Sequence, residues 1–250
     1  MNKILVINNK IKDFSEDDVT ITGNHIIFRK NGDYTIEYIN SNKIDLTIEL
    51  KEDCFIKLFE FSNNKDITIN NQYLLAKNSN LLLFKFYANN NTHEKIIFDL
   101  NDENAKLNYH FSSLATTNDI YHLIINHHSQ NTRSNIINRS LTKENASIDF
   151  TIDDFLPQGV KNCYLNQDTK IIVLGNNNST IRPNMYIEEV DVEARHASSI
   201  GKFSQDEIFY LMTRGINYDD AIKLLIKGLI FSNLVVSDEI EEKILTILNS

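Results

Sequence analysis

The chain has 250 residues, a formal net charge of −9 at pH 7, and 42% hydrophobic and 24% charged residues. Such a chain is long enough to bury a core without disulfides or a structural metal. The acidic balance argues against a nucleic-acid partner bound through a broad phosphate-facing surface. Two cysteines make no disulfide framework, and no apolar run is long enough for a signal peptide or a membrane span. We therefore expect a cytoplasmic protein with no membrane partner.

Short apolar runs follow one another from about residue 3 to residue 200. In the segment 44–50, isoleucine and leucine alternate with polar residues, which is the period of a half-buried strand. Comparable runs occupy residues 54–61, 67–69, 81–87, 96–100, 121–125, 148–152, 171–174 and 185–192. Asparagine-rich clusters between them predict tight turns, since Asn tolerates the left-handed backbone region. Strands without intervening helices favour a β-sandwich, a barrel or a parallel β-helix, and no clean internal repeat decides among these.

The pattern changes to helical spacing after residue 200. Ser204 begins a capping box, and Asn217 and Ser237 occupy the N-cap positions of two further amphipathic segments. We therefore predict a β-domain over residues 1–200 and a helical domain over residues 201–250. Because open coil ends expose sheet edges, we expect the helices to cover one end if the β-domain is a solenoid.

Residues 191–216 read DVEARHASSIGKFSQDEIFYLMTRGI and carry an ordered set of motif positions. These positions are Asp191, Val192, Ala194, His196, Gly201, Phe209, Tyr210, Leu211, Arg214, Gly215, Ile216, Ala221, Leu224, Leu225 and Gly228. The pattern resembles the C-terminal signature of the SufB/SufD family of iron–sulfur cluster assembly proteins. Weaker similarity extends upstream to about residue 120.

The resemblance implies a mainly β fold: a right-handed parallel β-helix core followed by a small C-terminal helical domain. It implies a non-enzymatic scaffold that docks a SufC-type ATPase through its helices. It also implies pairing with a SufB-type subunit, or with itself, through the β-helix. The implied cofactor is a transient iron–sulfur cluster shared with the partner, with none tightly bound to the isolated chain.

Local features distinguish the two branches of the family. The segment from His196 to Gly201 has the SufD spacing, and Ala197 stands where SufB members carry a glutamate. The SufB cysteine that takes sulfur falls near residues 168–169, where this chain has no thiol. The sequence is therefore SufD-like.

Two kinds of candidate site residue follow. An imidazole can bind iron or accept a proton near neutral pH, so the motif makes His196 a candidate shared ligand of iron or a cluster. Cys163 is the second candidate ligand, and a reactive thiolate there would need an electropositive setting. The residues expected to bind the ATPase are Phe209, Tyr210, Arg214 and Gly215.

Alternative interpretations rest on other polar residues. Strand alternation would place His127 on the face opposite His122 and His128, which predicts surface or turn histidines rather than a metal site. Asp153 and Asp154 could serve a carbohydrate-processing β-helix enzyme, although their place before an expected turn and the absence of Trp argue against this. An interaction module without a cluster role is the third interpretation. Cys54 is expected to be a buried apolar residue.

Overall fold

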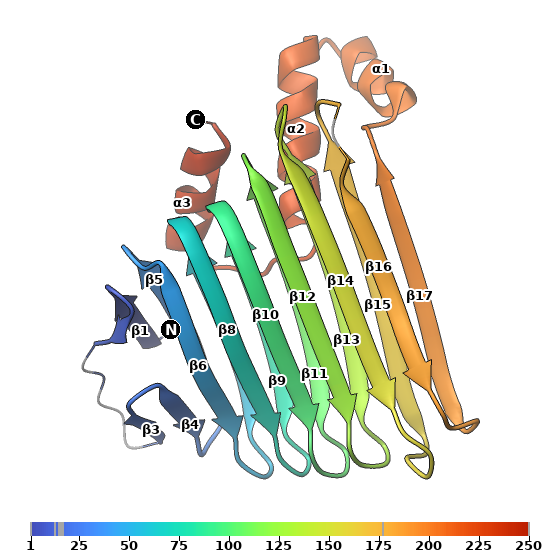
Figure 1. Ribbon diagram of the computed structural model, residues 1–250. Coiled ribbons are helices and arrows are strands. Elements are labelled where there is room, and N and C mark those ends of the chain that lie inside the picture. Colours follow the sequence, from blue (N-terminus) through green and yellow to red (C-terminus); the bar gives the residue numbers. More distant parts are fainter. Residues whose placement is uncertain (1, 13, 15–17, 177, 250) are drawn as a thin grey trace.

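The computed structural model describes residues 2–12, 14, 18–176 and 178–249, whose strands form two sheets (Figure 1). The nine-stranded sheet contains β1 (Asn2–Ile7), β2 (Lys10–Ile11), β5 (Gly32–Ile39), β7 (Phe55–Ser62), β9 (Asn80–Tyr87), β11 (Lys106–Ala115), β13 (Arg133–Thr142), β15 (Cys163–Val173) and β17 (Val192–Gly201). The eight-stranded sheet contains β3 (Val19–Thr22), β4 (His25–Phe28), β6 (Lys43–Leu50), β8 (Lys65–Leu75), β10 (Asn90–Leu100), β12 (Asn118–His127), β14 (Ser147–Leu156) and β16 (Thr180–Ile187).

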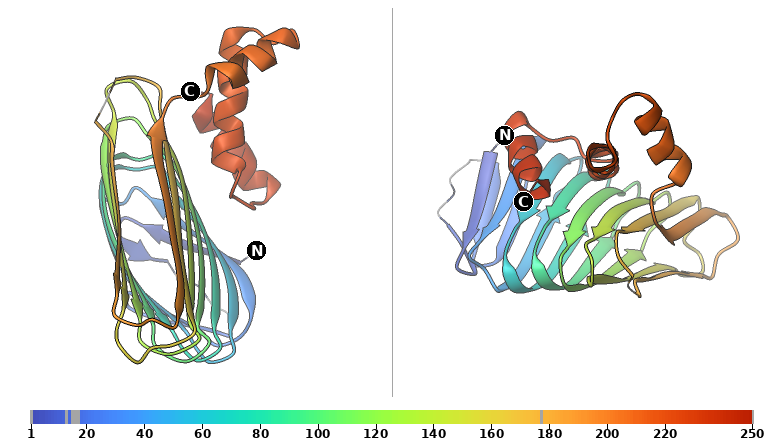
Figure 2. Two further views of the ribbon diagram at one scale, coloured as in Figure 1. Left: turned by 90° about the vertical axis from the view of Figure 1, so that its right-hand side faces the viewer. Right: turned by 90° about the horizontal axis from the view of Figure 1, so that it is seen from above.

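From β5 onward the chain passes from one sheet to the other with each successive strand. The sheet partners are parallel throughout, except for the hairpins β1–β2 and β3–β4. Figure 2 shows the two sheets facing each other around a narrow interior. The predicted parallel β-helix is therefore confirmed, and a sandwich of antiparallel strands is excluded.

Alternation along each strand builds the core between the two sheets. Ile44, Leu46, Ile48 and Leu50 face inward and are buried, as their period predicts. Aromatic rings fill the interior of the middle coils, where Phe111 packs edge-to-face on Tyr121 with ring centroids 4.9 Å apart. Burial of these rings removes a large apolar area from water and supplies much of the stability of the fold.

Asparagine shapes the coil corners, as the composition predicts. Within the described residues, every non-glycine residue with a positive φ is Asn or Asp. Some of these side chains also stack from coil to coil: the Asn78 amide donates to Asp53 Oδ1 and the Asn104 amide to Asn78 Oδ1, each at 2.8 Å. Left-handed corners and amide stacking thus use the same residue type.

Coil length changes along the solenoid. His25 of β4 pairs with Thr47 of β6, whereas Asp149 of β14 pairs with Thr180 of β16, so the eight-stranded sheet repeats after 22 residues at one end and after 31 at the other. A changing period explains why the sequence shows no clean repeat.

The interior also holds charged residues. Lys85 Nζ lies 2.5 Å from Glu94 Oε1 and 3.5 Å from Glu60 Oε2, and all three side chains are fully inaccessible to solvent. The hydroxyls of Tyr73 and Tyr87 donate to Glu60. Buried charges are tolerated when they are paired and hydrogen-bonded in this way.

Three helices follow β17: α1 (Gln205–Thr213), α2 (Tyr218–Phe231) and α3 (Asp238–Leu248). The capping box at Ser204 is present, whereas the Ser237 side chain makes no capping hydrogen bond at the start of α3. Helices α2 and α3 pack on the outer face of the nine-stranded sheet (Figure 2), where Phe84 and Phe86 contact apolar residues such as Ile230. The expectation that the helices cover a coil end is therefore wrong. The helices bury their apolar residues on this sheet face because its outward-facing aromatic residues make it apolar.

Candidate functional site

The interior becomes polar in the last coils, near the C-terminal end of the solenoid. Ser134, Asn138 and Ser140 of β13 face inward and are fully buried. The Asn138 amide donates to Thr169 Oγ1 at 2.9 Å, and the Gln167 amide donates to the Asn184 carbonyl oxygen at 3.4 Å. The sequence of β13, RSNIINRSLT, places polar residues at most inward positions. The last coils therefore provide a polar interior, unlike the aromatic interior of the middle coils.

His196 lies at the end of this polar interior. It is the register partner of Gln167 and therefore belongs to the inward face of β17. β16 and β17 are the last strands of their sheets, so no described coil covers them and His196 is exposed. Among the described residues, no group of three or more His, Cys, Asp or Glu side chains is arranged to hold a metal ion. His196 thus offers a single accessible imidazole.

Cys163 and His196 are not brought together. Cys163 is the register partner of Val192, four positions before His196 on the same strand. At the rise of a β-strand this places the two residues roughly 13 Å apart. They belong to separate parts of the terminal coils.

Cys163 instead lies in a buried cluster with His127. The Thr132 hydroxyl stands between them, 2.7 Å from His127 Nδ1 and 3.2 Å from Cys163 Sγ. On the other side of the ring, His127 Nε2 is 3.3 Å from Asp154 Oδ1 and 3.1 Å from Ser134 Oγ. The side chains of His127 and Asp154 are fully buried, and Cys163 is 3% exposed.

The electrostatics of this cluster favour charge separation. Burial lowers the pKa of His127, but Asp154 and Cys163 outweigh this effect and raise it to about 9. Burial raises the pKa of the Cys163 thiol, but hydrogen bonds with His127 and Thr132 hold it below its usual value. The His127 imidazolium and the Cys163 thiolate therefore stabilise each other.

These positions correct two predictions. His127 is a fully buried residue rather than a surface or turn histidine, because stacking of the next coil brings Asp154 against it. The two aspartates lie within β14 rather than in a turn, and they face opposite sides of the sheet. Asp153 faces outward, where it contacts His122 Nε2 at 2.6 Å. Paired carboxylates of a glycosidase must flank one substrate, so this arrangement argues against a carbohydrate-processing site.

Other predictions about these side chains hold. His122 and His128 lie on the opposite side of the strand from His127, and each contacts a carboxylate of a neighbouring coil. Cys54 is buried, as expected, and its Sγ lies 3.7 Å from the Phe28 carbonyl oxygen.

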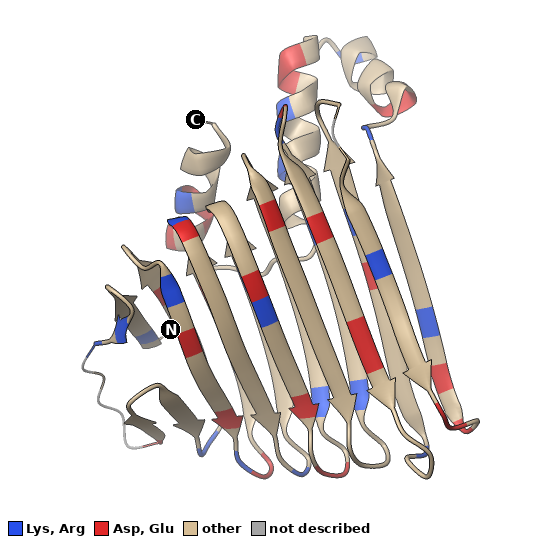
Figure 3. Cartoon of the chain, in the orientation of Figure 1, with Lys and Arg blue, Asp and Glu red and all other residues tan. Residues whose placement is uncertain are grey.

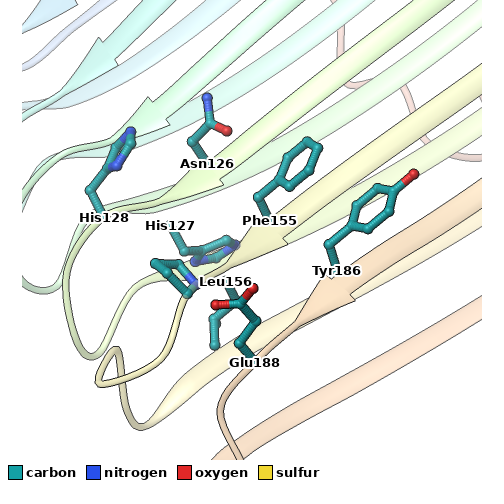
Figure 4. A pocket seen from close by; sticks show the side chains of 8 residues that line it. Asn126, His127, His128, Phe155, Leu156, Tyr186 and Glu188 are labelled. Atoms are coloured by element: carbon teal, nitrogen blue, oxygen red, sulfur yellow. The ribbon is translucent and has the colours of Figure 1, made fainter.

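Two surface pockets adjoin the cluster. The first, of about 270 Å³, is lined by His127 and by Asn126, His128, Phe155, Leu156, Pro157, Tyr186 and Glu188 (Figure 4). The rings of Phe155 and Tyr186 stack beside it with centroids 4.6 Å apart. The second pocket, of about 410 Å³, is lined by Cys163 together with Arg133, Tyr164 and Asp191. These pockets could not be predicted from the sequence, since each collects residues from several coils.

Helix α1 presents an unusual apolar surface. Phe209 and Tyr210 are 69% and 58% exposed, and Met212 is 45% exposed. The Arg214 guanidinium lies 5.2 Å from the centre of the Tyr210 ring, and the helix ends before Gly215, whose φ of 86° suits a residue without Cβ. The residues predicted for partner binding are therefore exposed side by side, and Met212 adds to them.

The rest of the molecule has neither a basic stripe (Figure 3) nor an apolar helix of membrane-spanning length among its described residues. Figure 3 shows acidic and basic residues interspersed along the eight-stranded sheet rather than gathered in one basic stripe. Within the described part of the chain, no helix has both the length and the apolar character needed to cross a membrane.

The fold and the site define a class of protein: a two-sheet parallel β-solenoid with an open polar end and an amphipathic helical extension. The family model described as the SUF system FeS cluster assembly SufBD core domain matches residues 14–229. The chain therefore belongs to the SufBD family of iron–sulfur cluster assembly proteins.

The similarity to individual relatives is low in identity and covers only part of the chain. The chain is similar to the iron–sulfur cluster assembly protein SufD of Bacillus subtilis, with 30% identity over 94 residues, or 37% of this chain and 22% of the relative. It is 26% identical to a SufBD family protein of Staphylococcus saprophyticus over 106 residues, or 42% of this chain and 23% of the relative. The matches thus span less than a quarter of each relative.

Proposed function

We propose that this chain is a SufD-like, non-enzymatic scaffold subunit that works in the cytoplasm with a SufC-type ATPase and a SufB-type subunit. The observation that carries the proposal is the position of His196, accessible on the inward face of β17, the edge strand of the nine-stranded sheet. An imidazole placed there can be shared with whatever protein pairs with that edge.

The edge itself supports a protein partner. An exposed sheet edge presents unpaired backbone donors and acceptors, which a second chain can satisfy by adding a strand. The apolar side chains of Tyr186, Val190 and Ile200 are exposed near this edge, and Val190 is 97% exposed. A SufB-type subunit, or a second copy of this chain, would bury them.

Helix α1 supports a second partner. Exposed aromatic residues beside an arginine are the side chains that most often dominate binding energy in protein interfaces. Phe209, Tyr210 and Arg214 form such a group, and α1 has only Ile208 buried against the rest of the chain. We assign this surface to the ATPase.

The cluster is a cargo assembled between subunits in this proposal. Iron–sulfur clusters are normally held by several thiolates, and His196 has no thiol nearby. The remaining ligands would come from the partner. ATP-driven movement of α1 would then distort the end of the solenoid and expose the shared site.

The test is co-expression with SufC-type and SufB-type proteins, followed by mass measurement of the intact complex. A complex that contains this chain together with the ATPase is the expected result. Recovery of the chain alone, under conditions in which the other two proteins associate, would contradict the proposal. An interaction module without a cluster role would form the complex but leave cluster content unchanged on His196→Ala.

A further inference from the structure

The buried cluster around Cys163 is separate from the His196 edge and has no part in the proposed function. It connects two sides of the solenoid, since His127 lines the pocket in Figure 4 and Cys163 lines the pocket beside Arg133 and Asp191. Cys163 is only 3% exposed, so small molecules can reach its sulfur through that second pocket more readily than large ones.

The geometry of the cluster forms a proton relay. Thr132 Oγ1 is within hydrogen-bond distance of both Cys163 Sγ, at 3.2 Å, and His127 Nδ1, at 2.7 Å. The Thr132 hydroxyl also lies 2.9 Å from the Ser129 carbonyl oxygen, to which it can donate. When its proton turns toward Nδ1 instead, the hydroxyl can accept the thiol proton in exchange. Asp154, 3.3 Å from Nε2, stabilises the imidazolium that results. Activated thiols typically have this arrangement, in which a base lies near the nucleophile and an acidic residue orients the base.

We propose that Cys163 is a site of oxidation by small hydroperoxides, with Thr132 and His127 as its proton relay. The thiolate attacks one peroxide oxygen, the O–O bond breaks, and an S–O bond forms. The departing oxyanion, hydroxide from hydrogen peroxide or alkoxide from an organic hydroperoxide, takes the relayed proton from His127 and leaves as water or an alcohol. The sulfur loses two electrons to the peroxide and becomes a sulfenic acid.

Two observations favour a small hydroperoxide over a disulfide substrate. The carbonyl oxygens of Lys161 and Ser129 lie 3.4 and 3.7 Å from Cys163 Sγ, which crowds the approach that thiol–disulfide exchange requires. The other cysteine, Cys54, precedes β7, four strands away from β15 in the nine-stranded sheet. That separation is roughly 19 Å, too far for a disulfide, so the sulfenic acid has no resolving thiol within the chain.

Cys54 supplies a matched internal control. It too is buried, it too precedes or begins a strand at a coil corner, and its thiol also faces a backbone carbonyl oxygen. Burial raises the pKa of the Cys54 thiol, and no histidine contributes to it. The two thiols therefore differ in the relay and in the pocket that Cys163 lines, and Thr132→Val changes the relay alone.

The experiment treats the full chain with hydrogen peroxide, traps sulfenic acid with dimedone, and measures the adduct at each cysteine by mass spectrometry over time. We expect adduct at Cys163 to form at least ~10-fold faster than at Cys54, and to be absent in Cys163→Ser. Thr132→Val, which keeps the shape and removes the relay, should slow the reaction at Cys163 by ~10-fold or more, within the usual range of acid–base assistance. The pH midpoint of the reaction should lie below ~8.5 in the wild type, the value of an ordinary thiol.

Equal rates at Cys163 and Cys54 would overturn the proposal. So would an unchanged rate in a Thr132→Val variant that retains the wild-type thermal transition. His127→Gln is a second test of the base, and Thr132→Val decides the question if His127→Gln does not fold.

Discussion

Gln167 and His196 are register partners on the same inward face of the nine-stranded sheet, yet Gln167 is fully buried and His196 is exposed. One further coil would be enough to bury His196. The solenoid therefore ends one layer too early to close over this residue, and a partner that pairs with β17 would complete that layer.

The first prediction concerns the cluster. The isolated chain, reconstituted anaerobically with iron and sulfide, should hold no stable cluster, because it offers one imidazole and no neighbouring thiol at the edge. The complex with its partners should hold one, and His196→Ala should remove most of it, as measured by absorbance and iron content. Ser198→Ala, an exposed change on the same face of the same strand, is the matched control. A stable cluster on the isolated chain that disappears with Cys163→Ser would make Cys163 the main ligand instead.

The second prediction concerns the ATPase. Replacing Tyr210 and Arg214 together with alanine should abolish ATPase binding in a pull-down, since interface anchors of this kind contribute about 2 kcal/mol or more each. Both side chains are exposed, so the thermal transition should stay in place.

A similar pair elsewhere provides the control for that experiment. The Arg133 guanidinium lies 6.0 Å from the ring centre of Tyr164, far from α1 along the strands. Removing this pair should leave ATPase binding unchanged. Undiminished binding by the Tyr210 and Arg214 double variant would refute the assigned surface.

The third prediction concerns the buried ion pairs. Lys85→Met leaves Glu60 and Glu94 in the core without a cation and should lower the free energy of unfolding by about 3–5 kcal/mol. Adding Glu94→Leu removes one stranded carboxylate, so the double variant should be more stable than Lys85→Met alone. Chemical denaturation measures both. Lys95→Met, next to Glu94 but exposed, should change stability by less than about 0.5 kcal/mol, and an equal effect of Lys85→Met would show that the network is not structural.

The fourth prediction concerns pH. Burial raises the pKa of Asp119 to about 6, although Oδ1 accepts a hydrogen bond from the Thr92 backbone N–H at 2.7 Å and Oδ2 accepts one from Tyr121 at 3.2 Å. Between about pH 4 and 6 the folded state therefore binds more protons than the unfolded state, and stability falls as the pH rises. Above pH 6 the full cost of the buried charge is present.

Asp119→Asn replaces the carboxylate by a neutral amide, whose oxygen can still accept the hydrogen bond from the Thr92 N–H. The free energy of unfolding of the variant minus that of the wild type should therefore increase from pH 4 to pH 7. The increase should be up to about 3 kcal/mol, at 1.4 kcal/mol per pKa unit. Urea denaturation across this pH range is the measurement. Parallel stability curves for the two proteins would show that Asp119 does not titrate as described.

Much of the fold could be predicted because its signals are local. Alternation in β6, helix caps at Ser204 and Asn217, and Asn-rich corners depend on residues close in sequence. β13 was missed because its inward positions include Ser134, Asn138 and Ser140, which break the apolar pattern. β11 was missed although Leu107, Tyr109 and Phe111 alternate on its inward face. The strand predicted over residues 185–192 was wrong in extent, since β16 ends at Ile187 and a turn precedes β17.

The site could be predicted only where the motif named it. The residues of the Cys163 cluster come from β12, β14, β15 and the segment before β13, and coil stacking rather than sequence spacing brings His127 to Asp154. Lys85 similarly meets Glu94 across the interior from the opposite sheet. Such contacts leave no periodic trace in the chain.

The lengthening of the coils, from 22 to 31 residues along the eight-stranded sheet, gives the layers of the solenoid different sizes, apart from the equal repeats of 25 residues between β6, β8 and β10. In an array of equal repeats, a strand can pair with the wrong neighbour and still satisfy every hydrogen bond. Here a shift by one layer would leave corners of the wrong length and place asparagines where the backbone does not turn. The change in coil length thus specifies which strands pair. It disfavours both misordered folding and exchange of coils between molecules.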